Sequence, residues 1–394
     1  MGFVAFVDDL NVDQQNKINN SKVKYFLPWR SVQNDNSVTT PTRIVFDASQ
    51  PTSSGFSLND TLAKGTNNMN SMLMIVARWL IRRFAFHMDV QKMYNTIKLC
   101  EDDWAYQLYL WDDELNPENE PRVKSVLTVI YGVKPSGNLA ERGLRETARL
   151  QRDEYPRVNE IVQNDVYVDD CLSGEDSARD RDKVTDQMSI VVGKGGFRFK
   201  GPTYSGCDPP DDLKFPDNSI NVAGLKWFPK SDVLGLKIGE MKFGRKSKSR
   251  KSRKTTQVIL GSFTRVDCAG RVGEIFDLMG WCTPIVAGFK LDLNELSKRK
   301  LHWDDYVPEE LIDEWKNNFD LITDLGKLRF KRLIVPEDAV DLKMETIEIS
   351  DASLKLACAA VYGRCRRKMV LSLANLFSLA PKLSQTDSTS PGLN

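Results

Sequence analysis

The sequence holds few of the residues that build several common catalytic sites. Only two of its 394 residues are histidines, His87 and His302, so zinc sites and histidine-dependent nucleophiles are poorly supplied. Seven cysteines are spread along the chain without a C-x-x-C pair, which is typical of a reducing compartment rather than of a disulfide framework. A metal, if one is used, should therefore be a hard ion held by carboxylates.

Long apolar runs and a strong net charge are also missing. The longest apolar stretch, Met72–Ala77, is interrupted by Arg78 and is far shorter than the roughly 20 residues that cross a bilayer. The first residues carry no export or lipidation signal, so we expect an intracellular, cytoplasmic protein without a membrane partner. The 55 basic and 54 acidic residues nearly cancel, so any nucleic acid must be bound by local clusters.

The residue pattern predicts an α+β protein of ordinary globular composition, with 41% hydrophobic and 28% charged residues. Short apolar runs predict strands over residues 24–29, 42–47, 84–90, 104–111 and 126–131. Apolar residues at helical spacing predict helices over residues 71–84, 139–151 and 176–192. An apolar segment broken by two adjacent acids, residues 165–174, predicts a tight hairpin.

The beginning and the last third of the chain have different patterns. The polar residues 11–22 predict a frayed lead-in. Beyond residue 255 two helical faces are expected, one formed by Val272, Ile275, Phe276 and Met279 and one by Leu311, Trp315, Phe319 and Ile322. Alternation predicts strands over residues 345–361, and the Ser/Thr/Pro-rich residues from Ser378 predict an unpacked tail.

Three carboxylates stand out because each follows an apolar strand. Asp169 and Asp170 follow Val166–Val168, and Asp89 follows Phe84–Met88. Neighbouring acids at the end of a buried strand repel each other unless a cation lies between them. If the strands are neighbours, Asp89 and Asp169 can hold two divalent ions about 3.5 to 4 Å apart, as in phosphoryl transfer, and Mg²⁺ suits such ligands. Alternatively, these acids cap strands or turns at the surface.

Several segments resemble reverse transcriptases. Tyr167-Val168-Asp169-Asp170 is similar to their catalytic hairpin, and Phe86–Tyr94 to their first carboxylate strand. One branch, the BEL/Pao-type retrotransposon polyproteins (Pao retrotransposon peptidase family), resembles the chain from about residue 24 to 362. The segments that carry this resemblance are Tyr25–Pro28, Arg43–Ser49, Ser57–Asp60, Tyr167–Gly174, Gly195–Phe197, Gly224–Trp227, Gly273–Gly280 and Trp303–Leu311.

The resemblance implies an RNA-directed DNA polymerase with a right-hand fold of fingers, an antiparallel palm sheet and a helical thumb or connection. Asp89 and Asp169 would be the metal ligands, with Asp170 as the second hairpin acid. The cofactor would be two Mg²⁺ ions, or Mn²⁺ in their place. The partners would be an RNA or DNA template with its primer and deoxynucleoside triphosphates, and the location would extend to virus-like particles or the nucleus.

The resemblance also implies residues that contact the substrate. Tyr94 would crowd the sugar 2′-position, and Arg43 would contact the triphosphate; their alternatives are an aromatic packed under a strand and an ordinary exposed strand residue. Gly132 and Ser136 match the loop that seats the template base and nucleotide. That loop departs from the family pattern, because Gly137 stands where proline is expected. The departure puts the efficiency of the polymerase in question, and the alternative function is an inactive retroelement fragment that at most binds nucleic acid.

The same resemblance divides the chain into five parts: a lead-in (1–23), fingers and palm (24–230), a basic loop region (231–256), a helical thumb or connection (257–335), and an incomplete ribonuclease H-like segment with a disordered tail (336–394). Within the basic loop region, eight of the thirteen residues 242–254 are Lys or Arg. This run predicts a phosphate-backbone contact, a solvated insertion or a nuclear-import signal. The last part begins its ribonuclease H likeness near Asp351, but Ser390–Leu393 supplies no Glu where the second acid of that fold is expected, and no Asp-Ser/Thr-Gly motif occurs in the sequence. We therefore expect neither ribonuclease H nor peptidase activity.

Overall fold

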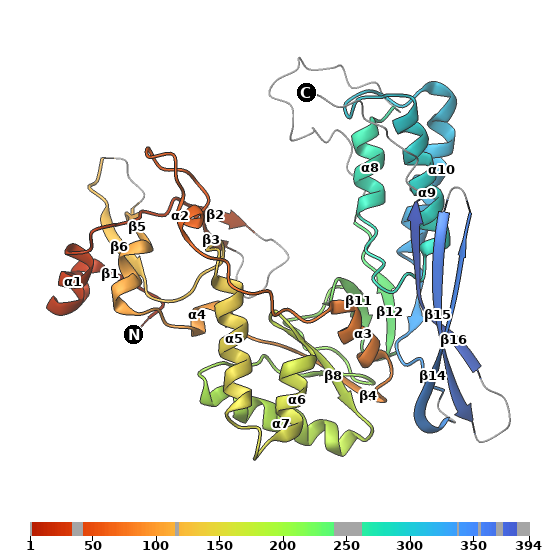
Figure 1. The fold of residues 1–394 in the computed structure, drawn as a ribbon, viewed down its shortest axis with the longest axis horizontal. Helices are drawn as coiled ribbons and strands as arrows, with labels where there is room; N and C mark the ends of the chain where they lie inside the picture. The colour runs from red at the N-terminus through yellow and green to blue at the C-terminus, as the bar shows by residue number, and fades with distance from the viewer. Residues whose placement is uncertain are drawn as a thin grey trace. The chain divides into compact units, whose positions relative to one another are not determined.

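The structure is a computed structural model that describes residues 2–33, 42–114, 118–239, 262–336, 339–353, 356–367 and 373–383. The basic run 242–254 lies outside these residues. The chain divides into two compact units (Figure 1): unit 1 contains residues 1–75, 84–204 and 210–214, and unit 2 contains residues 76–83, 205–209 and 215–394. Within the described ranges, no helix has the length and apolar character needed to cross a membrane.

Near its start, unit 1 forms a helix where the sequence predicted a frayed lead-in. Helix α1 (Val12–Asn19) starts at a capping box, in which the Asn11 side chain accepts a hydrogen bond from the Gln14 amide at 2.9 Å. Ile18 is 2% exposed and packs near Trp104. The prediction for residues 11–22 was therefore wrong, because a cap and one buried side chain outweighed the polar composition.

Unit 1 also contains a small antiparallel sheet whose strands lie on both sides of this helix in the sequence. Its strand order is β1 (Val4–Phe6), β6 (Arg122–Val126) and β5 (Leu108–Trp111). The strand predicted over residues 104–111 begins only at Leu108, since residues 101–106 form the 3-10 helix η2 (Glu101–Tyr106). The strand predicted over 126–131 lies earlier, in β6. Another 3-10 helix, η1 (Val7–Asp9), links β1 to α1.

A hairpin and short helices complete the first part of unit 1. Strands β2 (Trp29–Gln33) and β3 (Thr42–Phe46) pair in antiparallel register, so the second of the two predicted strands is confirmed and the first is displaced toward the C-terminus. The short helices are α2 (Leu58–Thr61) and α4 (Met93–Thr96). Helix α3 (Met72–Leu80), predicted from its apolar spacing, passes from unit 1 into unit 2.

The largest sheet of unit 1 confirms the predicted carboxylate strand and hairpin. Its order is β7 (Val166–Tyr167), β8 (Asp170–Glu175), β4 (Phe84–Asp89) and β9 (Thr203–Tyr204), all antiparallel. Helices α5 (Ser136–Arg149), α6 (Pro156–Asn164) and α7 (Ala178–Lys194) lie together along it (Figure 1). The helices predicted over 139–151 and 176–192 correspond to α5 and α7.

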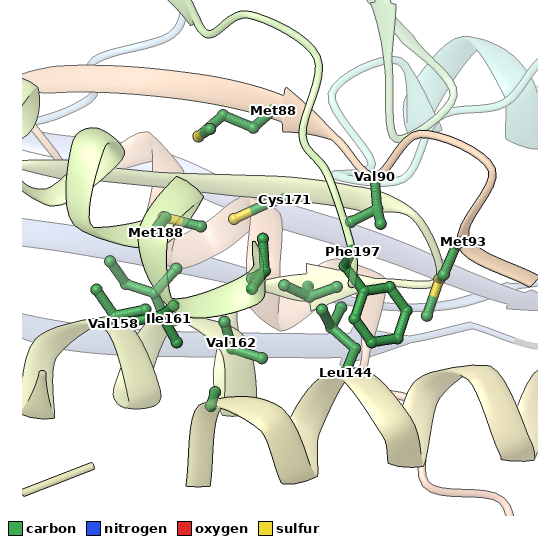
Figure 2. Packing of buried hydrophobic residues seen from close by; sticks show 14 of the residues in the cluster. Met88, Val90, Met93, Leu144, Val158, Ile161, Val162, Cys171, Met188 and Phe197 are labelled. Carbon is green, nitrogen blue, oxygen red and sulfur yellow. The ribbon is translucent and has the colours of Figure 1, made fainter. Parts of the chain in front are cut away.

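Alternating residues of the sheet face these helices and form the main core of unit 1. Phe86 and Met88 of β4 and Cys171 of β8 are at most 1% exposed and belong to one hydrophobic cluster. Figure 2 shows Met88 and Cys171 with Leu144, Ile161 and Met188, which come from α5, α6 and α7. Burying each such side chain contributes roughly 1.5 to 3 kcal/mol, so this cluster fixes which face of β4 carries His87 and Asp89.

The described part of unit 2 contains two further antiparallel sheets and, besides the end of α3, three helices. One sheet has the order β10 (Ile220–Val222), β11 (Leu225–Phe228), β12 (Val233–Leu236) and β13 (Phe330–Lys331). The helices expected in the thumb or connection are α8 (Arg265–Gly273), α9 (Thr283–Lys298) and α10 (Glu309–Leu325). The last sheet is a meander of β14 (Ala339–Ala352), β15 (Leu356–Arg367) and β16 (Leu373–Leu383).

Two predictions for this half of the chain were wrong in part. The face assigned to Val272, Ile275, Phe276 and Met279 is not one helix, because α8 ends at Gly273. The Asp277 carboxylate instead accepts hydrogen bonds from the Trp281 and Cys282 amides, at 3.0 and 2.7 Å, and so organises the turn before α9. The tail expected to be unpacked from Ser378 continues as β16 to Leu383, and residues beyond it lie outside the described part of the chain.

A buried arginine joins three distant segments of unit 2. Arg332 is fully buried, and its guanidinium donates two hydrogen bonds, each 2.7 Å long, to the Asp232 carboxylate. It also donates to the carbonyl oxygen of Trp79 at 2.6 Å. The Trp79 ring in turn packs edge-on against Trp227, with 4.9 Å between ring centroids. A buried charge requires such complete pairing, since an unpaired one is strongly destabilising.

We predict that Asp232→Asn lowers the free energy of unfolding of unit 2 by about 3 kcal/mol, because it leaves the Arg332 charge without its counterion. The matched control is Asp208→Asn, which breaks an exposed ion pair with Lys230 and should cost less than about 1 kcal/mol. Denaturant unfolding followed by tryptophan fluorescence measures both, since Trp79 and Trp227 lie at the pair. Equal losses in the two variants would contradict the prediction.

Candidate active site

The register of the largest sheet brings the three predicted carboxylates to one place. Asp89, the last residue of β4, is paired directly with Asp170, the first residue of β8. Asp169 occupies the two-residue turn between β7 and β8, and its carbonyl oxygen accepts a hydrogen bond from the Val90 amide at 2.8 Å. The prediction that the two strands are neighbours is therefore confirmed.

The turn that carries Asp169 is strained. Val168 has a φ of 55°, in the left-handed region that a β-branched residue rarely adopts. Backbone outliers of this kind cost about 1 to 3 kcal/mol and occur often at functional sites. The strained residue lies directly before the carboxylate that the sequence singled out.

Asp169 experiences the strongest electrostatic perturbation of the three acids. Burial raises the pKa of its carboxyl group to about 6, and the neighbouring charges of Asp170 and Asp89 contribute in the same direction. Lys200 opposes this shift only weakly. The site thus concentrates more negative charge than its own surroundings neutralise, which is a common property of catalytic and cation-binding sites.

The other two acids have specific side-chain partners that sequence analysis missed. Lys200 forms an ion pair with Asp89, with 3.0 Å between Nζ and Oδ1. His87, which is 4% exposed, lies with its Nε2 2.9 Å from Oδ1 of Asp170. The signal for His87 was available, because it lies two residues before Asp89 and thus on the same face of β4. Lys200 gave no comparable local signal.

The chemistry of these ligands fits a hard divalent ion, but the side chains are not gathered around one point. Carboxylate oxygens are the ligands that Mg²⁺ prefers. However, in the described ranges no group of three or more His, Cys, Asp or Glu side chains is close enough to hold a metal. An ion at this place would have to draw Asp89 away from Lys200 and Asp170 away from His87. Asp89, Asp169 and Asp170 are the residues that would hold it.

Two tyrosines lie near these acids. The rings of Tyr94, on α4, and Tyr131 are 4.1 Å apart between centroids. Burial raises the pKa of Tyr131 to about 12, with further contributions from the Asp169 charge and from Tyr94, while Arg43 acts in the opposite direction. The structure therefore brings Tyr94 and Arg43, both predicted as substrate contacts, into the electrostatic range of Tyr131. Sequence analysis did not select Tyr131, whose ring is 54% exposed.

The predicted nucleotide-seating loop is held by backbone contacts. Gly132 has a φ of 91°, and a Cβ there would lie 2.8 Å from the carbonyl oxygen of Phe46, so only glycine fits. The carbonyl oxygen of Gly132 accepts a hydrogen bond from the Asn59 side chain at 2.8 Å. Ser136 is buried at the start of α5 and its amide donates to the Val133 carbonyl. Ser136 is therefore buried at the junction of this loop with α5.

Comparison with protein families supports a Pao retrotransposon origin. Residues 264–378 are similar to the family described as "Pao retrotransposon-like RNaseH-like domain". A search of curated proteins found no match. The matched segment lies entirely in unit 2 and does not include Asp89 or Asp169.

The matched range also changes two expectations for the last third of the chain. The match to the ribonuclease H-like family begins at residue 264, near the start of α8, whereas the sequence placed it from residue 336. The matched range therefore includes the helices expected as thumb or connection. The description conflicts in part with the expectation of no ribonuclease H function. Asp351, the acid predicted to begin this segment, is exposed in β14 and accepts a hydrogen bond from the Ala352 amide at 2.9 Å.

The raised pKa of Asp169 predicts a specific pH dependence of stability. Between about pH 4 and pH 6 the folded chain keeps a proton that the unfolded chain releases, so the free energy of unfolding falls as pH rises through this window. We expect Asp169→Asn to remove this loss and to be more stable than the wild type above pH 6, on the order of 1 to 2 kcal/mol after solvent screening. The difference should vanish near pH 4.

Thermal unfolding at several pH values in EDTA measures this effect. Asp186→Asn, at an exposed position of α7, is the control and should stay within about 0.5 kcal/mol of the wild type at every pH. A constant difference between Asp169→Asn and the wild type from pH 4 to pH 8 would show that Asp169 is not the titrating group.

Proposed function

We propose that this protein is an RNA-directed DNA polymerase of a Pao-type retroelement. The observation that carries the proposal is the convergence of Asp89, Asp169 and Asp170 at the end of β4 and the β7–β8 hairpin, with one carboxyl group whose pKa is raised to about 6. Carboxylates that crowd each other are suited to binding divalent cations. The Pao-like match of residues 264–378 supports a retroelement setting for this site.

The residues of the chain have distinct parts in this reaction. When bound, two divalent ions would lower the barrier to attack by the primer 3′-hydroxyl and neutralise the departing pyrophosphate. Asp89 and Asp169 would hold these ions, with Asp170 as the second hairpin acid, whose contact with His87 would open when an ion binds. The ion pair between Lys200 and Asp89 keeps a positive charge beside the carboxylates and must open or shift when an ion binds.

The substrate would lie against the tyrosine pair and the loop that follows it. Tyr94 would contact the sugar, and the exposed Tyr131, whose ring lies tilted against that of Tyr94, enlarges that surface. The positive charge of Arg43 near Tyr131 suits a triphosphate. Gly132 is exposed, and the absence of a side chain lets it lie against the Phe46 carbonyl oxygen.

The departure of the loop from the family pattern does not disturb the start of α5. Pro135 occupies the N-cap position of this helix, where a missing amide hydrogen costs little. Gly137 lies beside the Tyr94 hydroxyl, which a Cβ at 137 would approach to 3.8 Å. An inactive retroelement fragment remains the alternative function, and primer extension separates the two.

We expect the full chain to extend a DNA primer on an RNA template in the presence of Mg²⁺. Asp89→Asn and Asp169→Asn should each lower the rate by at least about 10²-fold, because each removes a charged metal ligand. Asp186→Asn, an exposed acid on α7, is the matched control and should keep the wild-type rate. Extension that survives both site substitutions would refute the proposed site, and no extension by the wild type would favour the inactive fragment.

The proposed position of Tyr94 predicts that the enzyme selects deoxyribonucleotides over ribonucleotides. Replacing Tyr94 with valine should raise the incorporation of ribonucleotides relative to deoxyribonucleotides by roughly 10 to 100-fold, because the effect is a lost steric clash. Competition assays with paired nucleotides measure the ratio. Tyr109→Val removes a tyrosine from β5, in a different sheet of unit 1. The folded fraction of this variant should show an unchanged ratio. An unchanged ratio in Tyr94→Val would exclude Tyr94 from the sugar site.

A further inference from the structure

Unit 1 has a cavity of about 490 Å³ beside the chain that follows Asp89. Gln91, Lys92 and Asn95 line one part of it, and Gly196 and Arg198 line another. Neither the three carboxylates nor Arg43 lines this cavity. Its size falls within the range of small-molecule sites, about 300 to 1,000 Å³.

The charge of the cavity is entirely positive. Lys92, Lys98 and Arg198 all line it, and none of its lining residues is an aspartate or glutamate. Elsewhere in unit 1 comparable cations are neutralised by acids, as Lys17 is by Glu101 and Lys200 by Asp89. Three like charges around one cavity repel one another unless an anion lies between them.

The cations come from two segments that the backbone holds together: Lys92 and Lys98 flank α4, and Arg198 lies in the segment after α7. The Gln91 amide, next to Lys92, donates a hydrogen bond to the Arg198 carbonyl oxygen at 2.8 Å. Lys98 forms an isolated β-bridge with Thr128. Lys92 has a φ of 50°, a conformation that few lysines adopt. The arrangement is therefore built by the fold rather than by chance neighbours on one surface strand.

The remaining walls combine polar groups with one large apolar surface. Thr128 supplies a hydroxyl group, and Trp104, 4% exposed, supplies an aromatic wall. The side-chain amide of Asn95 donates hydrogen bonds to the Thr128 hydroxyl and the Val129 carbonyl oxygen, at 3.4 and 3.5 Å, and so fixes this polar wall. A small monovalent anion would neutralise one of three charges and fill little of the volume. An anion with several charges and several acceptor oxygens fits both properties.

We propose that this cavity binds a condensed phosphate, either inorganic pyrophosphate or the triphosphate of a nucleotide. The inference deepens the proposed function, since these are the by-product and the substrate of polymerisation, and it adds a site separate from the carboxylates. The segment that carries Arg198 also carries Lys200, the partner of Asp89. A ligand bound in the cavity would therefore affect the position of Lys200, and with it Asp89, through the short segment from Arg198 to Lys200.

Isothermal titration of the full chain in EDTA tests the inference without any catalysis. Inorganic pyrophosphate and dATP should both bind, and deoxyadenosine, which has no phosphate, should bind at least about tenfold more weakly. Tighter binding of dATP than of pyrophosphate would identify a nucleotide as the ligand, and equal binding would identify pyrophosphate. The affinity should fall as salt is added.

The double variant Lys98→Gln/Arg198→Gln should weaken pyrophosphate binding by roughly 10 to 100-fold, because two charged contacts are lost. Both side chains are exposed, so the thermal midpoint should stay close to the wild-type value. Lys183→Gln, an exposed lysine on α7, is the matched control and should bind like the wild type. Absence of pyrophosphate binding, or equal binding by the double variant, would overturn the inference.

These outcomes are independent of the polymerase proposal. Asp89→Asn should keep pyrophosphate binding in EDTA, because Asp89 does not line the cavity. A chain that extends primers but does not bind pyrophosphate overturns this inference alone. A chain that binds pyrophosphate through Lys98 and Arg198 but never extends a primer overturns the polymerase proposal alone.

Discussion

The pairing of β4 with β8 is the interaction on which the candidate site depends. It places Asp89 opposite Asp170, although like charges in that position destabilise a sheet. The cost is offset on the opposite face, where Phe86, Met88 and Cys171 are buried against α5, α6 and α7. A shift of one residue would turn these side chains away from the core, so hydrophobic packing determines where the carboxylates meet.

The charges around this pairing are compensated unevenly. Lys200 neutralises Asp89, and His87 contacts Asp170, whereas the pKa of Asp169 is raised mainly by burial and further by the charges of its two acidic neighbours. The two partners also hold the carboxylates in separate orientations. Three carboxylates thus lie close together while their partners point two of them in different directions, and the strained Val168 directly precedes the third.

Local patterns predicted the parts of this structure that depend on local physics. Alternating apolar residues and the acids after them identified β4 and the β7–β8 hairpin, and helical spacing identified α3, α5, α7 and α10. Predictions failed where a contact from far along the chain decided the outcome. Helix α1 is stabilised through Ile18 packed near Trp104, and the partner of Asp89 lies more than a hundred residues further on, at Lys200. The contact between the Tyr131 and Tyr94 rings likewise depends on the tertiary fold, which local patterns do not reveal.

The burial of Trp79 has a consequence for the order in which the chain can become stable during synthesis. Residues 76–83 belong to unit 2, and the side chains that enclose Trp79 include Trp227 and Arg332. During synthesis, Trp79 would therefore leave the ribosome long before Trp227 and Arg332 are available to bury it. Until Arg332 emerges, the apolar segment that contains Trp79 stays accessible to chaperones and proteases, and it stays so in a fragment that ends before residue 332.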